Sequence, residues 1–198
     1  MIDSRMRKIA VTGVLASLSI VLGITGLGLI TWFPGASLTT LHVPVIIGAI
    51  LEGPVVGVFI GLLFGVFTMI QASLIAVNPA DMAFINPLIS VVPRLFIGLV
   101  SWFVYALITG RLRIKDKTVT VLRESLALII SAVAGSLTNT VLVLSALALF
   151  KIIPWATIWA IASVNGSLEA ALSAIIVFAV LSAWKHLPRH GGKSRLNR

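Results

Sequence analysis

Residues 86–94 read Asn-Pro-Leu-Ile-Ser-Val-Val-Pro-Arg and begin a long apolar run in the middle of the chain. The run contains Arg94, the one arginine that we place at membrane depth, because the other arginines lie at the ends of apolar segments. A charged side chain at that depth is costly, and where it occurs it marks a binding site or a structural ion pair. We therefore expect Arg94 to lie in a pocket of a membrane protein that captures a small anionic solute.

The composition is typical of a membrane protein. Of the 198 residues, 59% are hydrophobic and 11% are charged, whereas soluble domains carry about 25% charged residues. The chain has no cysteine, and its three histidines, His42, His186 and His190, form no metal-binding pattern. We expect one integral membrane domain over residues 1–198, an all-α bundle without a metal or a cofactor.

Six apolar segments are candidates for membrane spans, which take roughly 20 residues each. The second is short and interrupted by Pro44, and residues 31–42 before it are expected to form a connection with a turn. The first has no convincing cleavage site, so we interpret it as a retained helix rather than a signal peptide. The six predicted spans cover residues 8–30, 42–51, 55–75, 87–108, 124–150 and 155–184.

The basic residues predict the orientation of the bundle. All but two of the 15 lie in three clusters, before the first span, around residues 111–123 and in the tail after residue 184. Six spans with a cytoplasmic N-terminus place all three clusters, and the C-terminus, on the cytoplasmic side, as the positive-inside rule requires. The net charge of +9 therefore indicates membrane orientation and not nucleic-acid binding.

Polar side chains inside the apolar segments form the predicted substrate site. Arg94 is the strongest candidate because its guanidinium matches a carboxylate or phosphate in a bidentate fork. Asn165 and Glu169 lie one helical turn apart and share a face. Structural alternatives are a buried Arg94–Glu169 pair and a helix-bridging role for Asn139. The predicted substrate-binding residues are Arg94, Asn139, Asn165, Glu169, Asn86, His42 and Thr40.

Some of the polar residues near the outer ends of the spans have plainer explanations. His42 is better explained as a hydrogen-bonding residue at the membrane interface than as a ligand contact. We expect Asp81 to be a solvent-exposed or turn-forming residue of the loop that contains it. Catalytic motifs are missing from the sequence, and Gly191-Gly192-Lys193-Ser194 has Leu187 where a phosphate loop needs its first glycine. We therefore expect a protein that is not an enzyme.

Two spans carry stripes of small residues, which allow another helix to approach closely. The stripe in the third span consists of Gly57, Gly61 and Gly65. The stripe in the first span serves either packing inside the bundle or docking of a partner subunit, and it consists of Ala10, Gly13, Ala16 and Ser17.

Six helices in 198 residues, a short second span and a basic N-terminus resemble the substrate-binding S components of energy-coupling factor (ECF) vitamin transporters. The stripe in the first span resembles the family's alanine motif that docks the transmembrane T component, although its spacing is not a regular Ala-x-x-x-Ala. Residues 40–49, Thr-Leu-His-Val-Pro-Val-Ile-Ile-Gly-Ala, resemble the pantothenate-type branch. Residues 86–94 and residues 165–169, Asn-Gly-Ser-Leu-Glu, resemble patterns found more broadly in S components.

The resemblance implies a subunit in a prokaryotic plasma membrane that binds a water-soluble vitamin from outside, with pantothenate as the first choice. A T component and two cytosolic ATPases would supply the power. Arg94 would pair with the carboxylate of pantothenate, and Asn139, Asn165 and Glu169 would suit its polar groups.

Two alternatives remain open. Riboflavin, folate or another vitamin would fit the same fold, and an aromatic ligand would favour stacking on Trp32, Phe33 and Trp102. A stand-alone secondary transporter or channel for a small anion would be signalled by inverted repeats, and no convincing repeat is evident in the sequence.

Overall fold

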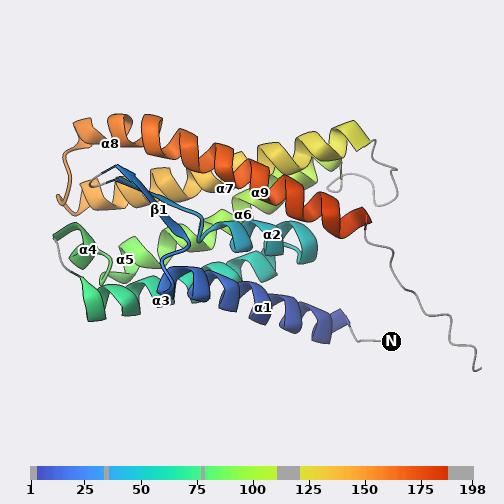
Figure 1. The fold of residues 1–198 in the computed structure, drawn as a ribbon, viewed down its shortest axis with the longest axis horizontal. Helices are drawn as coiled ribbons and strands as arrows, with labels where there is room; N and C mark the ends of the chain where they lie inside the picture. The colour runs from blue at the N-terminus through green and yellow to red at the C-terminus, as the bar shows by residue number, and fades with distance from the viewer. Residues whose placement is uncertain (1–3, 34–35, 77–78, 111–120, 187–198) are drawn as a thin grey trace, which may run out of the picture.

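The computed structural model describes residues 4–33, 36–76, 79–110 and 121–186, which form a helical bundle with one β-hairpin (Figure 1). The predicted helical class is confirmed, and the hairpin is an addition to it. In chain order the elements are α1 (Ser4–Ile24), β1 (Leu29–Phe33), β2 (Ala36–Thr39), α2 (Val43–Glu52), α3 (Pro54–Ile75), α4 (Pro79–Ala83), α5 (Pro87–Ser90), α6 (Val92–Thr109), α7 (Val121–Leu149), α8 (Trp155–Ile161), the π-helical segment η1 (Ala162–Gly166) and α9 (Ser167–His186).

Five helical segments are long and apolar enough to cross a membrane, judged by length and composition. Large apolar side chains such as Val14, Phe59, Phe103 and Ile175 are exposed on their outer faces, as expected where the surrounding solvent is lipid. The five segments are Arg5–Ile24, Pro54–Ile75, Pro87–Thr109, Val121–Leu149 and Trp155–Trp184.

The second predicted span, residues 42–51, corresponds to α2, which has only 10 residues and is therefore about 15 Å long. Its residues 43–50 are all buried, and it packs against α1, α3, α6, α7 and α9. A helix that is apolar on every side is stable only when other elements surround it. Pro44 lies in the first turn of α2, where its missing N–H costs no hydrogen bond. The prediction that Pro44 interrupts this segment is therefore wrong.

The connection predicted at residues 31–42 contains most of an antiparallel hairpin, in which Leu29 of β1 pairs with Thr39 of β2. The first helix ends at Ile24 instead of near residue 30. Gly26 then adopts a positive φ of 71°, a conformation that glycine allows at little cost. The backbone N–H of Thr40 donates to Gly28 O at 2.9 Å and holds the end of the hairpin against its start.

The glycine stripe of α3 brings its backbone against α5 and α6. A Cβ atom on Gly57 would lie 2.9 Å from the Cα of Gly98, and one on Gly65 would lie 2.8 Å from Ser90 O. A Cβ on Gly61 would collide with the carbonyl oxygen of Arg94. The predicted close-packing role of the stripe is confirmed, and it fixes the backbone from which the Arg94 side chain extends.

The start of α1 and the end of α9 lie at one end of the bundle, and the short helices α4, α5 and α8 lie at the other (Figure 1). The end of α6 and the start of α7 also lie at the first end. The hairpin extends toward α4, α5 and α8. The helix ends that adjoin the three basic clusters of the sequence are therefore on the same side.

Candidate functional site

A cavity of about 460 Å³, here called the Arg94 cavity, opens between the hairpin and the helices. It has the size and the mixed polar and apolar lining of a small-molecule site. Elements far apart in the sequence contribute to it, from β1 and β2 to α9. The polar residues that line it are Thr39, Thr68, Gln71, Asp81, Arg94, Asn139, Thr140, Asn165 and Glu169.

The position of Arg94 depends on a helix break. Pro93 has no N–H, so the carbonyl of Ile89 four residues earlier loses its normal helical partner. The chain accordingly divides into α5 and α6 at Val91. Arg94 Nη1 donates to Ile89 O at 2.5 Å. The proline thus frees an acceptor, and that acceptor anchors the arginine one residue further along.

Two aromatic rings complete the surroundings of the guanidinium. Its Cζ atom lies 5.5 Å from the ring centroid of Phe64 and 5.2 Å from that of Phe84, within the range of cation–π attraction. Phe84 is held in turn by its own carbonyl, which accepts a hydrogen bond from Ser90 Oγ. The Arg94 side chain is buried, and its Nε has no hydrogen-bond partner among the described residues. A buried cation with spare donors favours an anionic partner.

Glu169 lies on the same cavity in a different setting. Its Oε1 accepts the backbone N–H of Thr39 at 2.8 Å, and its Oε2 accepts the hydroxyl of Thr140 at 3.1 Å. Among the described residues an ion pair joins Arg7 to Glu52 at 2.6 Å, whereas no ion pair joins Arg94 to Glu169. Arg94 and Glu169 therefore do not form the buried pair considered above. The carboxylate instead ties the end of the hairpin to α7 and α9.

The two asparagines reach the cavity from α7 and η1. Asn139 is buried, and its Oδ1 has no hydrogen-bond partner among the described residues. Asn165 lies in the π-helical segment, a widened turn of a kind that is frequent at functional sites. The next residue, Gly166, lets α7 approach closely, because a Cβ there would lie 3.2 Å from Cγ2 of Thr140. The predicted shared face of Asn165 and Glu169 holds across the π-helical segment, since both line the cavity.

Three predicted site residues do not line the Arg94 cavity. His42 is fully buried, and its Nε2 pairs with Ser173 Oγ at 2.8 Å. Thr40 is buried, and its hydroxyl donates to Gly28 O at 3.4 Å. Asn86 is the N-cap of α5, where its side chain accepts the N–H of Leu88 at 3.0 Å. In the structure each of the three side chains makes a local hydrogen bond and does not line the cavity.

The small-residue stripe of α1 divides between two faces. Ala10, Gly13 and Ser17 are exposed, and Gly13 has nothing within 4 Å of an added Cβ. Ala16 is buried in the core beside α2. Three of the four residues therefore remain accessible to a partner, while Ala16 packs inside the bundle.

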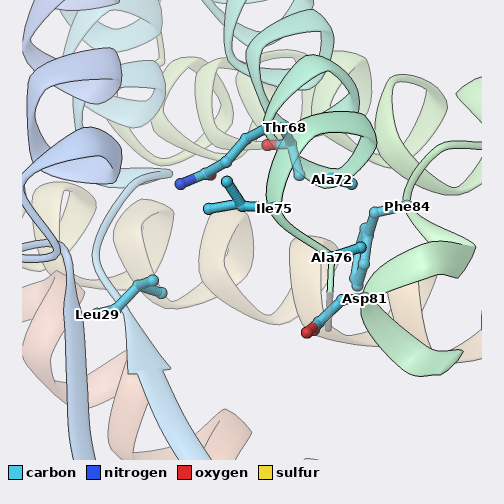
Figure 2. A pocket seen from close by; sticks show the side chains of 8 residues that line it. Leu29, Thr68, Ala72, Ile75, Ala76, Asp81 and Phe84 are labelled. Atoms are coloured by element: carbon cyan, nitrogen blue, oxygen red, sulfur yellow. The ribbon is translucent and has the colours of Figure 1, made fainter. Parts of the chain in front are cut away.

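The sequence analysis did not select several lining residues. Thr68 and Gln71 are polar residues in the apolar helix α3, the same signal that identified Asn139. Asp81 was assigned to a loop, yet it lines both the Arg94 cavity and an adjoining hollow. Figure 2 shows this hollow, with Leu29 on one side and Asp81 and Phe84 on the other. Trp102 is not among the lining residues, and the side chains of Trp32 and Phe33 lie outside the described residues.

Comparison of the sequence with known proteins identifies its family. The family model for the substrate-specific component of ECF transporters matches residues 7–181. The pantothenic acid transporter PanT of Lactococcus lactis subsp. cremoris (strain MG1363) is 29% identical over 164 residues, which cover 73% of this chain and 76% of that protein. Because the family match extends over most of its length, the chain belongs to the substrate-specific components of ECF transporters.

Proposed function

We propose that this chain captures pantothenate from the outer side of a prokaryotic plasma membrane. The observation that carries the proposal is the Arg94 cavity, where three separate helices and the π-helical segment bring Arg94, Asn139, Asn165 and Glu169 together. The similarity to a protein named as a pantothenic acid transporter supports the choice of vitamin.

The chemistry of pantothenate suits the two kinds of group in the cavity. Its carboxylate would accept from the guanidinium of Arg94, whose Nε has no protein partner among the described residues. Its amide N–H and hydroxyl groups would donate to acceptors such as Asn139 Oδ1. Glu169 would act through the hairpin that it holds, so its charge need not face the anion directly.

The aromatic lining favours pantothenate over a flavin or a pterin. Phe64 and Phe84 already lie against the guanidinium of Arg94, and Trp102 is not among the residues that line the cavity. One face of each of these rings is therefore already engaged by Arg94.

The proposed orientation has six membrane crossings, with α2 and the hairpin together forming the second, and both termini in the cytoplasm. All of residues 1–198 would then form one membrane domain. A transmembrane T component and two cytosolic ATPases would complete the importer, and these partners would hydrolyse ATP. The exposed residues Ala10, Gly13 and Ser17 of α1 would dock the T component, with Ala16 holding the helix in place.

The docking proposal is tested by Gly13→Leu, which adds a bulky side chain where there is open space in this chain. We expect the variant to bind pantothenate normally and to lose co-purification with the T component and the ATPases. Val14→Leu, on a neighbouring exposed position, is the matched control. Retained assembly in Gly13→Leu would show that this face is not the docking surface.

The vitamin is tested by calorimetric titration of the detergent-purified full chain with pantothenate, its neutral alcohol analogue pantothenol, riboflavin and folate. We expect saturable binding of pantothenate and no binding of riboflavin or folate. Pantothenol lacks the carboxylate and should bind at least about 100-fold more weakly. Binding of riboflavin or folate without pantothenate would contradict the proposal and keep the chain within the family.

A further inference from the structure

The first half of α1 lies on the outside of the bundle. None of its residues from 5 to 14 is buried, whereas the second half contains buried residues such as Ala16 and Ser19. Of the five membrane-length segments, α1 has the smallest buried share, 17% against 33% to 44% in the others. Lipid surrounds apolar side chains as readily as a neighbouring helix does, so apolar contact alone does little to hold this half against the bundle.

An ion pair joins this half of α1 to the bundle. Arg7 Nη2 lies 2.6 Å from Oε1 of Glu52, the last residue of α2, and Gly53 then turns the chain into α3. The Glu52 side chain is 8% exposed, and its Oε1 has no hydrogen-bond partner among the described residues. A buried carboxylate needs an opposite charge to offset its lost hydration. Arg7, which is 56% exposed, supplies that charge from a different helix.

The ion pair adjoins the small-residue stripe of α1. Arg7, Ala10 and Gly13 follow one another at three-residue spacing, so each is a neighbour of the next on the helix surface. An α-helix turns by about 100° per residue, and small residues let another helix approach closely only where they face it. A contact that fixes the rotation of α1 at Arg7 therefore also fixes the direction in which Ala10 and Gly13 face.

We propose that the Arg7–Glu52 ion pair positions the first half of α1 for docking of the T component. Glu52 is a positioning residue that acts through Arg7, because its own side chain is buried while the arginine is exposed. This proposal rests on the proposed function and deepens it, since it names the contact that holds the docking face in place. Solute binding is a separate matter, because neither Arg7 nor Glu52 lines the Arg94 cavity.

The test is a competition for assembly. Each full-length variant is co-expressed with the wild-type chain, the T component and the two ATPases of the same organism, and the complex is purified through a tag on one ATPase. Mass spectrometry then gives the ratio of captured variant to captured wild type, normalised to their amounts in the membrane. We expect about tenfold less capture of Glu52→Gln, because a smaller fraction of its molecules presents α1 in the docking orientation. Arg7→Lys keeps the charge and should be captured nearly as well as the wild type.

A double-mutant cycle shows whether the two residues act as a pair. If they do, the double variant of Arg7→Gln and Glu52→Gln should be captured no less than Arg7→Gln alone. Losses that add would show that each residue acts separately, and would overturn the proposal. The matched control is Lys8→Gln, which removes one positive charge from an exposed position next to Arg7 and should be captured like the wild type. An equal loss in Lys8→Gln would assign the effect to the basic charge of the N-terminus and overturn the role of the ion pair.

Two further measurements separate this inference from the proposed function. Glu52→Gln should bind pantothenate within about twofold of the wild type in calorimetric titration. A fall in affinity as large as the fall in capture would show a general structural role and overturn the positioning role. Capture of Glu52→Gln at the wild-type level, with Gly13→Leu excluded, would overturn this inference alone. Capture of both variants at the wild-type level would overturn the docking proposal and this inference together.

Discussion

Arg94 and Glu169 are both buried charges on the same cavity, yet the protein surrounds them differently. Arg94 receives one backbone carbonyl and two aromatic rings, and its Nε has no partner among the described residues. Both carboxylate oxygens of Glu169 accept a hydrogen bond from the protein, one from Thr39 and one from Thr140.

The difference separates two tasks that the sequence alone does not distinguish. A charge whose hydrogen-bonding capacity is left open is suited to a solute, because a buried ion needs a partner to offset its lost hydration. A charge already satisfied by the protein fixes the elements that satisfy it. We therefore propose that Arg94 binds the solute, whereas Glu169 holds the end of the hairpin against α7 and α9.

The largest effect is expected from Arg94→Ala. Removing the guanidinium should weaken pantothenate binding at least about 100-fold, the usual cost of losing one member of a buried charged pair. Calorimetric titration measures this effect, and pantothenol, which carries no charge, should lose much less affinity. Arg94→Lys keeps the charge, so its pantothenate affinity should lie between those of the wild type and Arg94→Ala. Normal pantothenate binding in Arg94→Ala would show that Arg94 is a structural residue and not a contact of the solute.

Gly61→Ala tests whether the backbone under Arg94 is as rigid as the packing indicates. The new methyl group would meet the carbonyl of Arg94, which cannot rotate away, so we expect a loss of about 2–3 kcal/mol in stability. Thermal unfolding in detergent is the measurement. Gly13→Ala, at an open position of α1, is the control and should be neutral or stabilising by up to about 1 kcal/mol. Equal stabilities of the two variants would argue against close backbone packing of α3 on α6.

Glu169→Ala should weaken pantothenate binding only about tenfold. The hairpin would lose its tie to α9, so a smaller fraction of molecules would be ready to bind. The effect should appear as faster dissociation and as faster hydrogen exchange of the Thr39 amide. Glu169→Gln keeps acceptor capacity and should show a smaller change. A loss as large as that of Arg94→Ala, without a change in exchange at Thr39, would instead identify Glu169 as a direct contact of the solute.

The smallest effect is expected from Asn86→Ala. This change removes the N-cap of α5 and should cost about 1 kcal/mol of stability. Pantothenate affinity should stay within about twofold of the wild type, because Asn86 does not line the Arg94 cavity. Thermal unfolding and titration of the same preparation give both values. A selective loss of affinity with unchanged stability would return Asn86 to the binding site.

The long helices and several residues that line the cavity could be predicted from the sequence because lipid imposes a simple rule. Apolar runs must be helical to satisfy their backbone, so α3 and α7 begin and end within three residues of their predicted limits. Polar residues inside such runs are rare, and all four that were selected at membrane depth, Arg94, Asn139, Asn165 and Glu169, line one cavity.

The hairpin and the short helix could not be predicted in the same way. Leu29 and Thr39 pair across the hairpin. The backbone amide of Thr39 donates a hydrogen bond to Glu169, which lies 130 residues further along the chain. Contacts of such long sequence separation leave no local pattern. The burial of α2 likewise depends on the five helices around it, so its short apolar run resembled an interrupted span.

The sequence by itself determined the membrane class, the basic clusters and four of the polar residues that line the cavity. Hydropathy, charge and proline position are local properties, and lipid makes them decisive. Only the tertiary structure decided that the protein satisfies both carboxylate oxygens of Glu169 and leaves Nε of Arg94 without a partner among the described residues. It placed the Ile89 carbonyl, freed by Pro93, beside Arg94, and it brought Thr39 and Thr140 to Glu169. Hydrogen-bond partners and close backbone approach depend on where whole helices pack, and that is a property of the assembled bundle.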